Sequence, residues 1–151
     1  MPGYSGTPLP QKLGIKAGQR VALLGAEADF DLALAPLPDD VRLVRRLGGA
    51  AKLDVIVLFA VDCAALEKSL MKAAAQLSEN GGLWISWLKK SSGRPTDLTE
   101  MEVRRAGLEL GLVDNKVCAV TEAWSGLRFA KRLRDRTRPR AGAARGRATG
   151  R

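Results

Sequence analysis

The sequence predicts an α/β domain whose mostly parallel sheet is covered by helices on both faces. Residues 53–60 (LDVIVLFA) and 83–88 (LWISWL) are short apolar runs without polar alternation, which is typical of strands buried on both sides. Between them, apolar residues recur at helical spacing from 66 to 77. A strand, a helix and a strand with short links form a βαβ unit, whose crossover should be right-handed. We therefore expect a small Rossmann-like three-layer sandwich with an antiparallel hairpin at its C-terminal end.

The elements before this unit are shorter. A proline at position 8 or 10 suits the start of a helical turn that reaches Leu13. Residues 20–25 (RVALLG) predict a buried strand that ends at Gly25, and residues 28–35 predict a short helix stopped by the prolines that follow. Alternating apolar and basic residues over 41–47 predict a further strand, ended by a pair of glycines.

The helix between the two buried strands has a recognisable start and end. Asp62 is placed to cap its first turn. One apolar stripe follows, formed by Leu66, Leu70, Ala73, Ala74 and Leu77. Asn80-Gly81-Gly82 is expected to end the helix before the second strand begins at Leu83.

A second helix and a hairpin complete the predicted domain. Thr99 and Glu102 have the spacing of a capping box, flanked by Leu98 and Val103 as a hydrophobic staple. This helix should reach about Leu110. Residues 116–122 and 127–133 then predict two antiparallel strands on either side of Trp124-Ser125-Gly126.

The positive charge of the chain is concentrated at one end. The 151 residues carry a formal charge of +9, and the segment from Lys131 to Arg151 alone carries nine basic residues and one acid. The body is therefore close to neutral, and the high pI describes a tail. We expect residues 1–133 to form the folded domain and residues 134–151 to form a low-complexity, disordered tail, because the tail has no apolar residue larger than alanine.

Several classes of protein are disfavoured by composition. There is no histidine, which removes Ser-His-Asp and Cys-His catalytic machinery. Two cysteines without CxxC spacing predict neither a disulfide framework nor a zinc site, so we expect no metal. The longest fully apolar run, residues 55–61, is too short to span a bilayer, and no signal peptide is visible. A cytoplasmic protein without a membrane association is the expectation.

The predicted fold indicates where a ligand would bind. In open parallel sheets, ligands bind beyond the carboxyl ends of the strands, where the strand order reverses. The segments expected there are Gly25-Ala26-Glu27, Ala60-Val61-Asp62 and the loop after Leu88. The candidate ligand-binding residues are Gly25, Lys89, Lys90, Ser91, Ser92, Gly93 and Asp97.

The loop after Leu88 is the favoured part of this site. Its lysines, hydroxyls and glycine suit an anion held by side-chain charge and backbone N–H groups. A solvated loop before a capped helix is the alternative, and Asp97 is placed to pair with Lys89 or Lys90. A dinucleotide fingerprint is missing, because Gly25 is followed by two acids within four residues instead of further glycines, so no cofactor is expected.

Six other residues or motifs are weighed against structural roles. Asp114-Asn115-Lys116 is expected to be a turn at the amino end of the sheet. Cys63 is expected in the first turn of a helix, where the dipole lowers the pKa of a thiol, but a redox role is disfavoured. Cys118 is expected in the core. Trp84 and Trp87 are expected on opposite faces of one strand, and Trp124 is expected to be partly exposed.

Three longer stretches carry a resemblance to a known family. They are GYSGTPLPQKLGIKAGQRVALLGA, GGLWISWLKKSSGRPTDLTE and GLVDNKVCAVTEAWSGLRF. Together they resemble a bacterial family of small proteins of unknown function, DUF3052, over about positions 3 to 132. The resemblance implies no activity. A weaker similarity is to the methyltransferase form of the Rossmann sheet, from which the chain departs by having Gly25 in place of a GxGxG loop and Arg45-Arg46 where an acid would bind ribose.

Three functional hypotheses follow. The favoured one is a non-catalytic binding module for an anionic small molecule or a protein partner at residues 89–93. The alternative is a small enzyme, such as a degenerate methyltransferase-like transferase, that uses Lys89, Lys90, Asp97 or Glu27. The third is nucleic-acid association through the basic tail, by neutralisation of phosphates. The tail residues that would make those contacts are Arg134, Arg136, Arg138, Arg140, Arg145 and Arg147.

Overall fold

The computed structural model describes residues 7–28, 30–49 and 51–132. Six strands form one sheet: β1 (Arg20–Leu24), β2 (Arg42–Val44), β3 (Leu53–Ala60), β4 (Leu77–Leu88), β5 (Leu112–Ala119) and β6 (Trp124–Lys131). The helices are α1 (Leu9–Leu13), α2 (Phe30–Leu34), α3 (Cys63–Gln76) and α4 (Glu100–Glu109), with a 3₁₀ turn, η1 (Lys90–Ser92). The tail residues predicted to contact nucleic acid lie outside the described residues.

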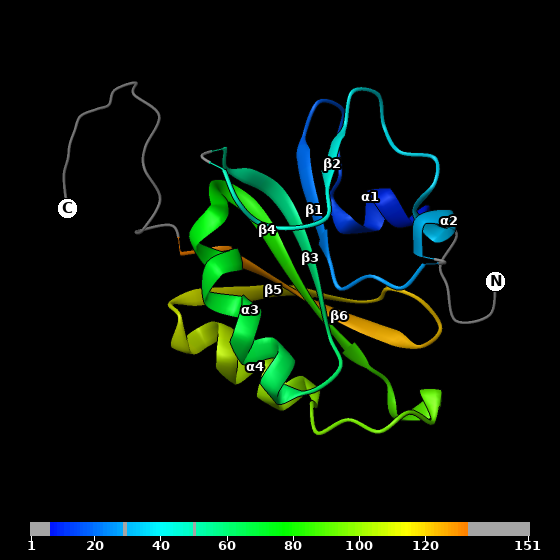
Figure 1. Cartoon of the computed structure of the whole chain (residues 1–151), viewed down its shortest axis with the longest axis vertical. Helices are drawn as coiled ribbons and strands as arrows, with labels where there is room; N and C mark the ends of the chain where they lie inside the picture. Colours follow the sequence, from blue (N-terminus) through cyan, green and yellow to red (C-terminus); the bar gives the residue numbers. More distant parts are fainter. Residues whose placement is uncertain (1–6, 29, 50, 133–151) are drawn as a thin grey trace.

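The sheet has a parallel part and an antiparallel part. Its strand order is β2-β1-β3-β4-β6-β5, and the first four strands are parallel. β6 is inserted between β4 and β5 and runs antiparallel to both. The predicted Rossmann-like sheet with a C-terminal hairpin is therefore confirmed (Figure 1).

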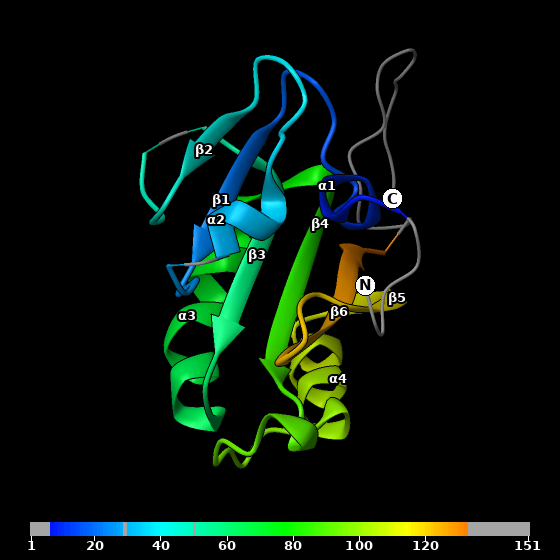
Figure 2. The ribbon, with the colours of Figure 1, turned by 90° about the vertical axis from the view of Figure 1, so that its right-hand side faces the viewer.

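Side chains alternate between two cores, one on each face of the sheet. On β3, Ile56, Leu58 and Ala60 face the helices α3 and α4, whereas Val55, Val57 and Phe59 face α1 and α2. Figures 1 and 2 show these helix pairs on opposite faces. The two predicted tryptophans on β4 divide in the same way, since Trp87 lies in the first core and Trp84 in the second. The uninterrupted apolar run of β3 thus reflects burial on both faces.

Most helix starts follow the predicted local chemistry. The carboxylate of Asp62 accepts a hydrogen bond from the amide of Ala65 at 2.9 Å, and the hydroxyl of Thr99 accepts one from the amide of Glu102 at 3.3 Å. Leu98 and Val103 are both buried in the same core, as a staple requires. The carboxylate of Glu102 pairs with Arg105 at 3.1 Å.

Two predicted boundaries are wrong. The helix predicted to end at Asn80-Gly81-Gly82 ends at Gln76, and β4 already begins at Leu77. Leu77 pairs with Leu53, and an irregularity in the register accommodates residues 78–81 before Gly82 pairs with Val55. The strand predicted over 41–47 is limited to Arg42–Val44, because it pairs with β1 over three residues only.

The hairpin is also shifted from its predicted register. Residues 124–126 were expected to be its turn, but they begin β6. The turn lies at 120–123, where the amides of Val120 and Thr121 donate to the carbonyl of Trp124 at 2.9 and 3.2 Å. Asp114-Asn115-Lys116, predicted as a turn, lies within β5 at a bulge in its pairing with β6.

Candidate functional site

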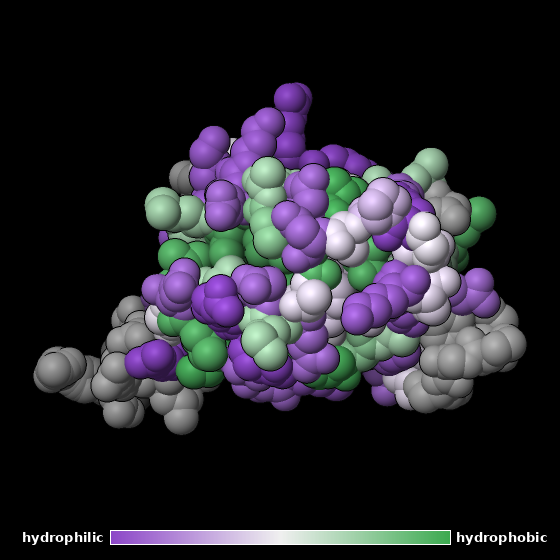
Figure 3. Space-filling view, turned by 90° about the horizontal axis from the view of Figure 1, so that it is seen from below, coloured by the Kyte–Doolittle hydropathy of each residue, from purple (hydrophilic) through white to green (hydrophobic). Residues whose placement is uncertain are grey.

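The carboxyl ends of β1, β3 and β4 meet at one end of the molecule, as predicted from their parallel pairing. The strand order reverses between β1 and β3, so the crevice expected for a ligand lies beyond Leu24 and Ala60. Figure 3 views the molecule from this end, where hydrophilic residues surround smaller apolar patches. This end is called the carboxyl edge below.

Gly25 brings the ends of β1 and β3 into close contact. Its φ of +75° is a conformation that favours glycine, and a Cβ atom there would lie 2.8 Å from the carbonyl oxygen of Phe59. Any other residue would therefore be strained and would displace the end of β3. The structure gives the predicted Gly25 a clear structural role at the reversal of strand order.

An arginine, a glutamate and a tryptophan link the loops of the carboxyl edge. Nη2 of Arg94 lies 2.7 Å from Oε2 of Glu27, so this ion pair joins the loop after β4 to the loop after β1. The indole N–H of Trp124 donates to Oε1 of Glu27 at 3.1 Å. The guanidinium also lies over the ring of Trp124, with its carbon 5.8 Å from the ring centroid. These three residues are called the edge triad.

The electrostatics of the edge triad are those of an anion held by two donors. The hydrogen bond from Arg94, followed by that from Trp124, lowers the pKa of Glu27 below its ordinary value. Both Arg94 and Glu27 keep more than two fifths of their side chains exposed. An ion pair this exposed is screened by solvent and contributes little, so Glu27 does not lock Arg94 away from solvent.

Trp124 is buried, contrary to the prediction that it would be partly exposed. Its side chain is 2% exposed and packs edge-to-face on Phe59, with ring centroids 5.0 Å apart. Phe59 packs in turn on Phe30 at 4.9 Å. The sequence could not indicate this burial, because Phe59, on which the ring of Trp124 packs, lies 65 positions away along the chain.

The predicted lysine and serine loop lies at this edge, and several of its backbone amides are already engaged. The amide of Lys89 donates to the carbonyl of Ala123 at 2.8 Å. The amides of Ser92 and Gly93 donate within the loop, and the amide of Arg94 donates to the hydroxyl of Ser92 at 3.1 Å. Lys90 and Ser91 are exposed, and Lys89 is half-buried. An anion here would therefore be held by side chains and by the backbone N–H groups of the loop that remain, those of Lys90 and Ser91.

Asp97 caps a helix. Its carboxylate accepts a hydrogen bond from the amide of Cys63, the first residue of α3, at 2.7 Å. This bond is the main reason that the pKa of Asp97 is lowered. Asp97 and Asp62 together satisfy two amides of the first turn of α3. The pairing of Asp97 with Lys89 or Lys90 that was considered from sequence is replaced by this contact.

Neither cysteine has the features of a reactive thiol. Cys63 begins α3 as predicted, but burial, followed by the interaction with Asp97, raises its pKa instead of lowering it. Burial also raises the pKa of Cys118, which packs against the core on the α1 and α2 face. Within the described ranges, no group of three Cys, Asp or Glu side chains is arranged to hold a metal ion.

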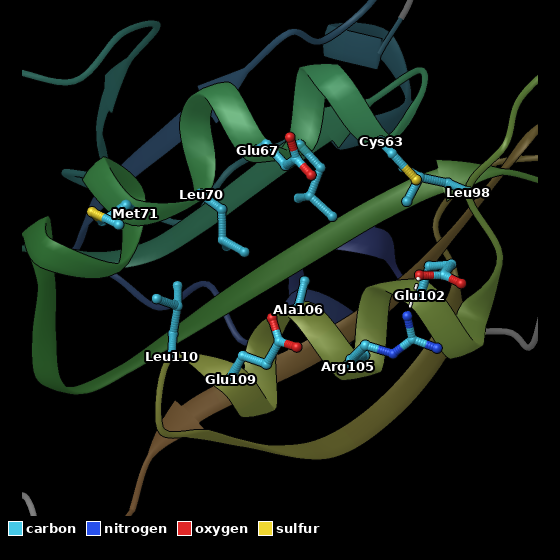
Figure 4. Close-up of a pocket in the computed structure, with 11 residues that line it drawn as sticks. Cys63, Glu67, Leu70, Met71, Leu98, Glu102, Arg105, Ala106, Glu109 and Leu110 are labelled. Atoms are coloured by element: carbon cyan, nitrogen blue, oxygen red, sulfur yellow. Dashed lines mark hydrogen bonds and ion pairs between the residues drawn. The ribbon is translucent and has the colours of Figure 1, made fainter.

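A groove of about 450 Å³ lies between α3 and α4, away from the edge triad. Figure 4 shows Leu70, Ala106 and Leu110 on its floor and acidic side chains at its rim. Those acids are Glu67, Glu102 and Glu109, against a single arginine, Arg105, that is paired with Glu102. This charge disfavours an anionic ligand in the groove, so the groove does not compete with the carboxyl edge for one.

A family model for "Protein of unknown function (DUF3052)" matches residues 10–133. The chain belongs to this family. No curated protein matches it in sequence. None of the helices in the described part of this DUF3052 chain is long and apolar enough to cross a membrane.

Solved structures, among them a methyltransferase, share the fold of this DUF3052 protein. The N-methyltransferase NodS from Bradyrhizobium japonicum WM9 is 15% identical, with a TM-score of 0.55 over 76% of this chain and 86% of that one. A DhpI-SAH complex is 10% identical, with a TM-score of 0.58 over 84% and 83%. A Methanococcus jannaschii fibrillarin pre-rRNA processing protein is 14% identical, with a TM-score of 0.54 over 84% and 70%. At these identities the likeness shows the fold alone.

Proposed function

We propose that the protein is a non-catalytic module that binds an anionic small molecule at the carboxyl edge, with Arg94 as the main contact. The observation that carries this proposal is the edge triad, because a half-exposed guanidinium is held at the reversal of strand order by one carboxylate. Arg94 has five N–H donors, of which the ion pair with Glu27 uses Nη2. Lys89 and Lys90 lie in the same loop and add positive charge.

In this proposal, Glu27 competes with the ligand for the guanidinium of Arg94. A ligand carboxylate or phosphate would take its place on Arg94, and Trp124 would keep the guanidinium in position by stacking. The exchange replaces one charge-assisted bond by another, so the cost of releasing Glu27 is small.

Methyl transfer is the alternative, and the fold likeness alone favours it. The residues do not fit S-adenosylmethionine, because the chain departs from the methyltransferase pattern at the two places where that cofactor would bind. Gly25 stands alone where a glycine-rich loop would approach the cofactor. After β2, Arg45 pairs with Asp31 at 2.7 Å where an acid would meet a ribose. We therefore derive no step through that cofactor.

The test compares two substitutions of the edge triad in calorimetric titrations with phosphate, citrate, adenosine monophosphate and S-adenosylmethionine. Arg94→Gln should weaken the binding of the preferred anion by about tenfold to a hundredfold, because it removes a charge-assisted hydrogen bond to the ligand. Glu27→Gln should strengthen binding by up to about fivefold, because it removes the competing carboxylate.

Arg105→Gln is the matched control. Arg105 is an exposed arginine with one ion pair, to Glu102, and it lies on α4 away from the triad. Its substitution should leave the affinity unchanged. Equal losses for both arginines, or S-adenosylmethionine bound with turnover of a methyl acceptor, would contradict the proposal.

A further inference from the structure

A second hollow lies at the opposite end of the sheet, where the parallel strands begin. It has a volume of about 400 Å³ and is lined by residues of α1 and the loop after it, β3, β4, β5 and β6. Figure 2 shows α1 toward this end of the molecule, away from the arrowheads of β3 and β4. The hollow is called the amino-edge pocket below, and no part of the edge triad lines it.

The amino-edge pocket is strongly cationic. Lys12, Lys16, Lys116 and Arg128 line it, against one carboxylate, Asp54. That carboxylate is already used within the fold, since it accepts a hydrogen bond from the amide of Arg20 at 2.9 Å and contacts the hydroxyl of Ser78 at 3.5 Å. The pocket therefore carries a net formal charge of about +3 in a concave surface, which concentrates anions.

The backbone of β4 makes room for Arg128. A Cβ atom at Gly82 would overlap the guanidinium of Arg128, so the absence of a side chain there lets the arginine lie across the sheet. Nη1 of Arg128 donates to Oδ1 of Asn115 at 3.3 Å. Asn115 sits at the bulge of β5, a feature that redirects side chains at the edges of sheets. Two local irregularities thus set one guanidinium in the pocket.

We propose that the amino-edge pocket binds the phosphate group of a phosphate ester. The Arg128 guanidinium matches the geometry of a phosphate, and Lys16 and Lys116 add point charges around it. The amides of Asn80 and Asn115 supply polar groups that orient the rest of the ligand. A volume near 400 Å³ is within the range of small-molecule sites.

Two sources of a phosphate ester are compatible with this chemistry. One is a free nucleotide or sugar phosphate that occupies the pocket alone. The other is the backbone of a nucleic acid, since β6 leads from Arg128 to Lys131, where the arginine-rich segment of the sequence begins. The experiment therefore uses adenosine diphosphate and a twelve-nucleotide single-stranded DNA as separate probes.

The main variant is the double substitution Lys16→Gln and Lys116→Gln in the full chain. Both lysines are exposed, so the fold should tolerate their loss. Binding of at least one probe should fall by tenfold or more, measured by calorimetry for the nucleotide and by fluorescence anisotropy for the DNA. For the DNA, the dependence of affinity on salt should also decrease, because two phosphate contacts are lost.

The matched control removes the same charge elsewhere. Lys68→Gln with Lys72→Gln changes two exposed lysines of α3, which do not line the pocket. This control should change either affinity by less than about twofold. If neither probe binds, or if both double variants lose affinity equally, the proposal is wrong.

A third variant tests geometry without changing charge. Gly82→Ala should push Arg128 out of position and weaken binding of the same probe, while thermal unfolding reports that the fold persists. Unchanged affinity in this variant would remove Arg128 from the site and overturn the proposed arrangement. Arg94→Gln should leave binding at this pocket intact, so failure at one edge is distinguishable from failure at the other.

Substitutions in the arginine-rich tail distinguish the two sources of the phosphate ester. In the full chain, Arg134, Arg136, Arg138 and Arg140 are replaced together by glutamine. Nucleotide binding that depends on Lys16 and Lys116 but not on these arginines identifies the free phosphate ester. DNA binding that depends on both sets identifies the nucleic acid. DNA binding that depends on the tail alone, together with no nucleotide binding that depends on Lys16 and Lys116, overturns the pocket's role.

Discussion

Gly107 shows how one missing side chain allows two elements to pack. It is buried in α4, and a Cβ atom there would overlap the ring of Phe129 on β6. In an exposed helix, replacement of glycine by alanine stabilises the helix by about 1 kcal/mol. Here the neighbour is a rigid, fully buried aromatic ring, which cannot move aside without disturbing the core.

Gly107→Ala should therefore destabilise the protein. Overpacking costs about 1–3 kcal/mol, which outweighs the gain in helix propensity. Urea denaturation should show a lower midpoint with an unchanged slope. The same substitution in a Phe129→Leu background should cost less, because the smaller side chain leaves room for the methyl group. A midpoint that rises in the Gly107→Ala variant would show that the ring adapts freely.

The residue scale is also where prediction from sequence fails most clearly. Trp124, Glu27 and Arg94 are each unremarkable in their local context, and their contacts join positions 30 or more apart. Gly25 could be identified because it follows an apolar run directly. Arg94 could not be identified, because nothing in the sequence around it indicates a partner in the loop after β1.

At the scale of elements, the first turn of α3 is held by two carboxylates. Asp62 is the local cap, and Asp97 reaches the amide of Cys63 from a loop 34 positions away. Negative charge at this end also interacts favourably with the helix dipole. Asp97 thus fixes the segment before α4 to the start of α3.

Asp97→Asn should reduce stability in a pH-dependent way. The hydrogen bond from the amide of Cys63 lowers the pKa of Asp97 in the folded state, so its stabilising contribution is complete above the unfolded-state pKa, near 4. That contribution is lost as the pH falls through the lower, folded-state pKa. Urea unfolding of both proteins between pH 7 and pH 2 should show a stability difference that shrinks in acid. A difference that stays constant over this range would exclude the charge of Asp97 as its cause.

Elements with strong local patterns agree with their predictions, and those whose limits depend on pairing do not. The bounds of β3 match the predicted 53–60, because the apolar run from 55 to 60 is buried on both faces of the sheet. Residues 78–81 look like a turn by composition, yet they belong to β4 because Leu77 pairs with Leu53. Asp114-Asn115-Lys116 differs for the same reason, since pairing with β6 overrides its turn-like composition.

At the scale of the whole molecule, burial is concentrated in the middle of the sheet. β3 and β4 are central, and from Leu83 to Leu88 every residue of β4 is buried. β2 lies at the edge, is three residues long and is exposed or half-buried throughout. Local opening should therefore differ widely between the two regions.

Hydrogen exchange should resolve this difference. Amides of β3 and β4 should exchange only by global unfolding, so their protection should follow the free energy of unfolding as urea is added. Amides of β2 should exchange by local opening, with much lower protection and little dependence on urea. Uniform protection across all six strands would show instead that the sheet opens as a single unit.

The position of β6 has a consequence for how this protein is made. Among the strands of residues 7–132, β6 is the last to be synthesised, yet it lies between β4 and β5. Until residue 131 has been translated, one edge of the apolar strand β4 (LWISWL) is therefore unpaired. Other nascent chains can form hydrogen bonds with this edge. Premature stop codons before Trp124 should yield insoluble fragments, whereas stops after Arg132 should leave a chain that closes its own sheet.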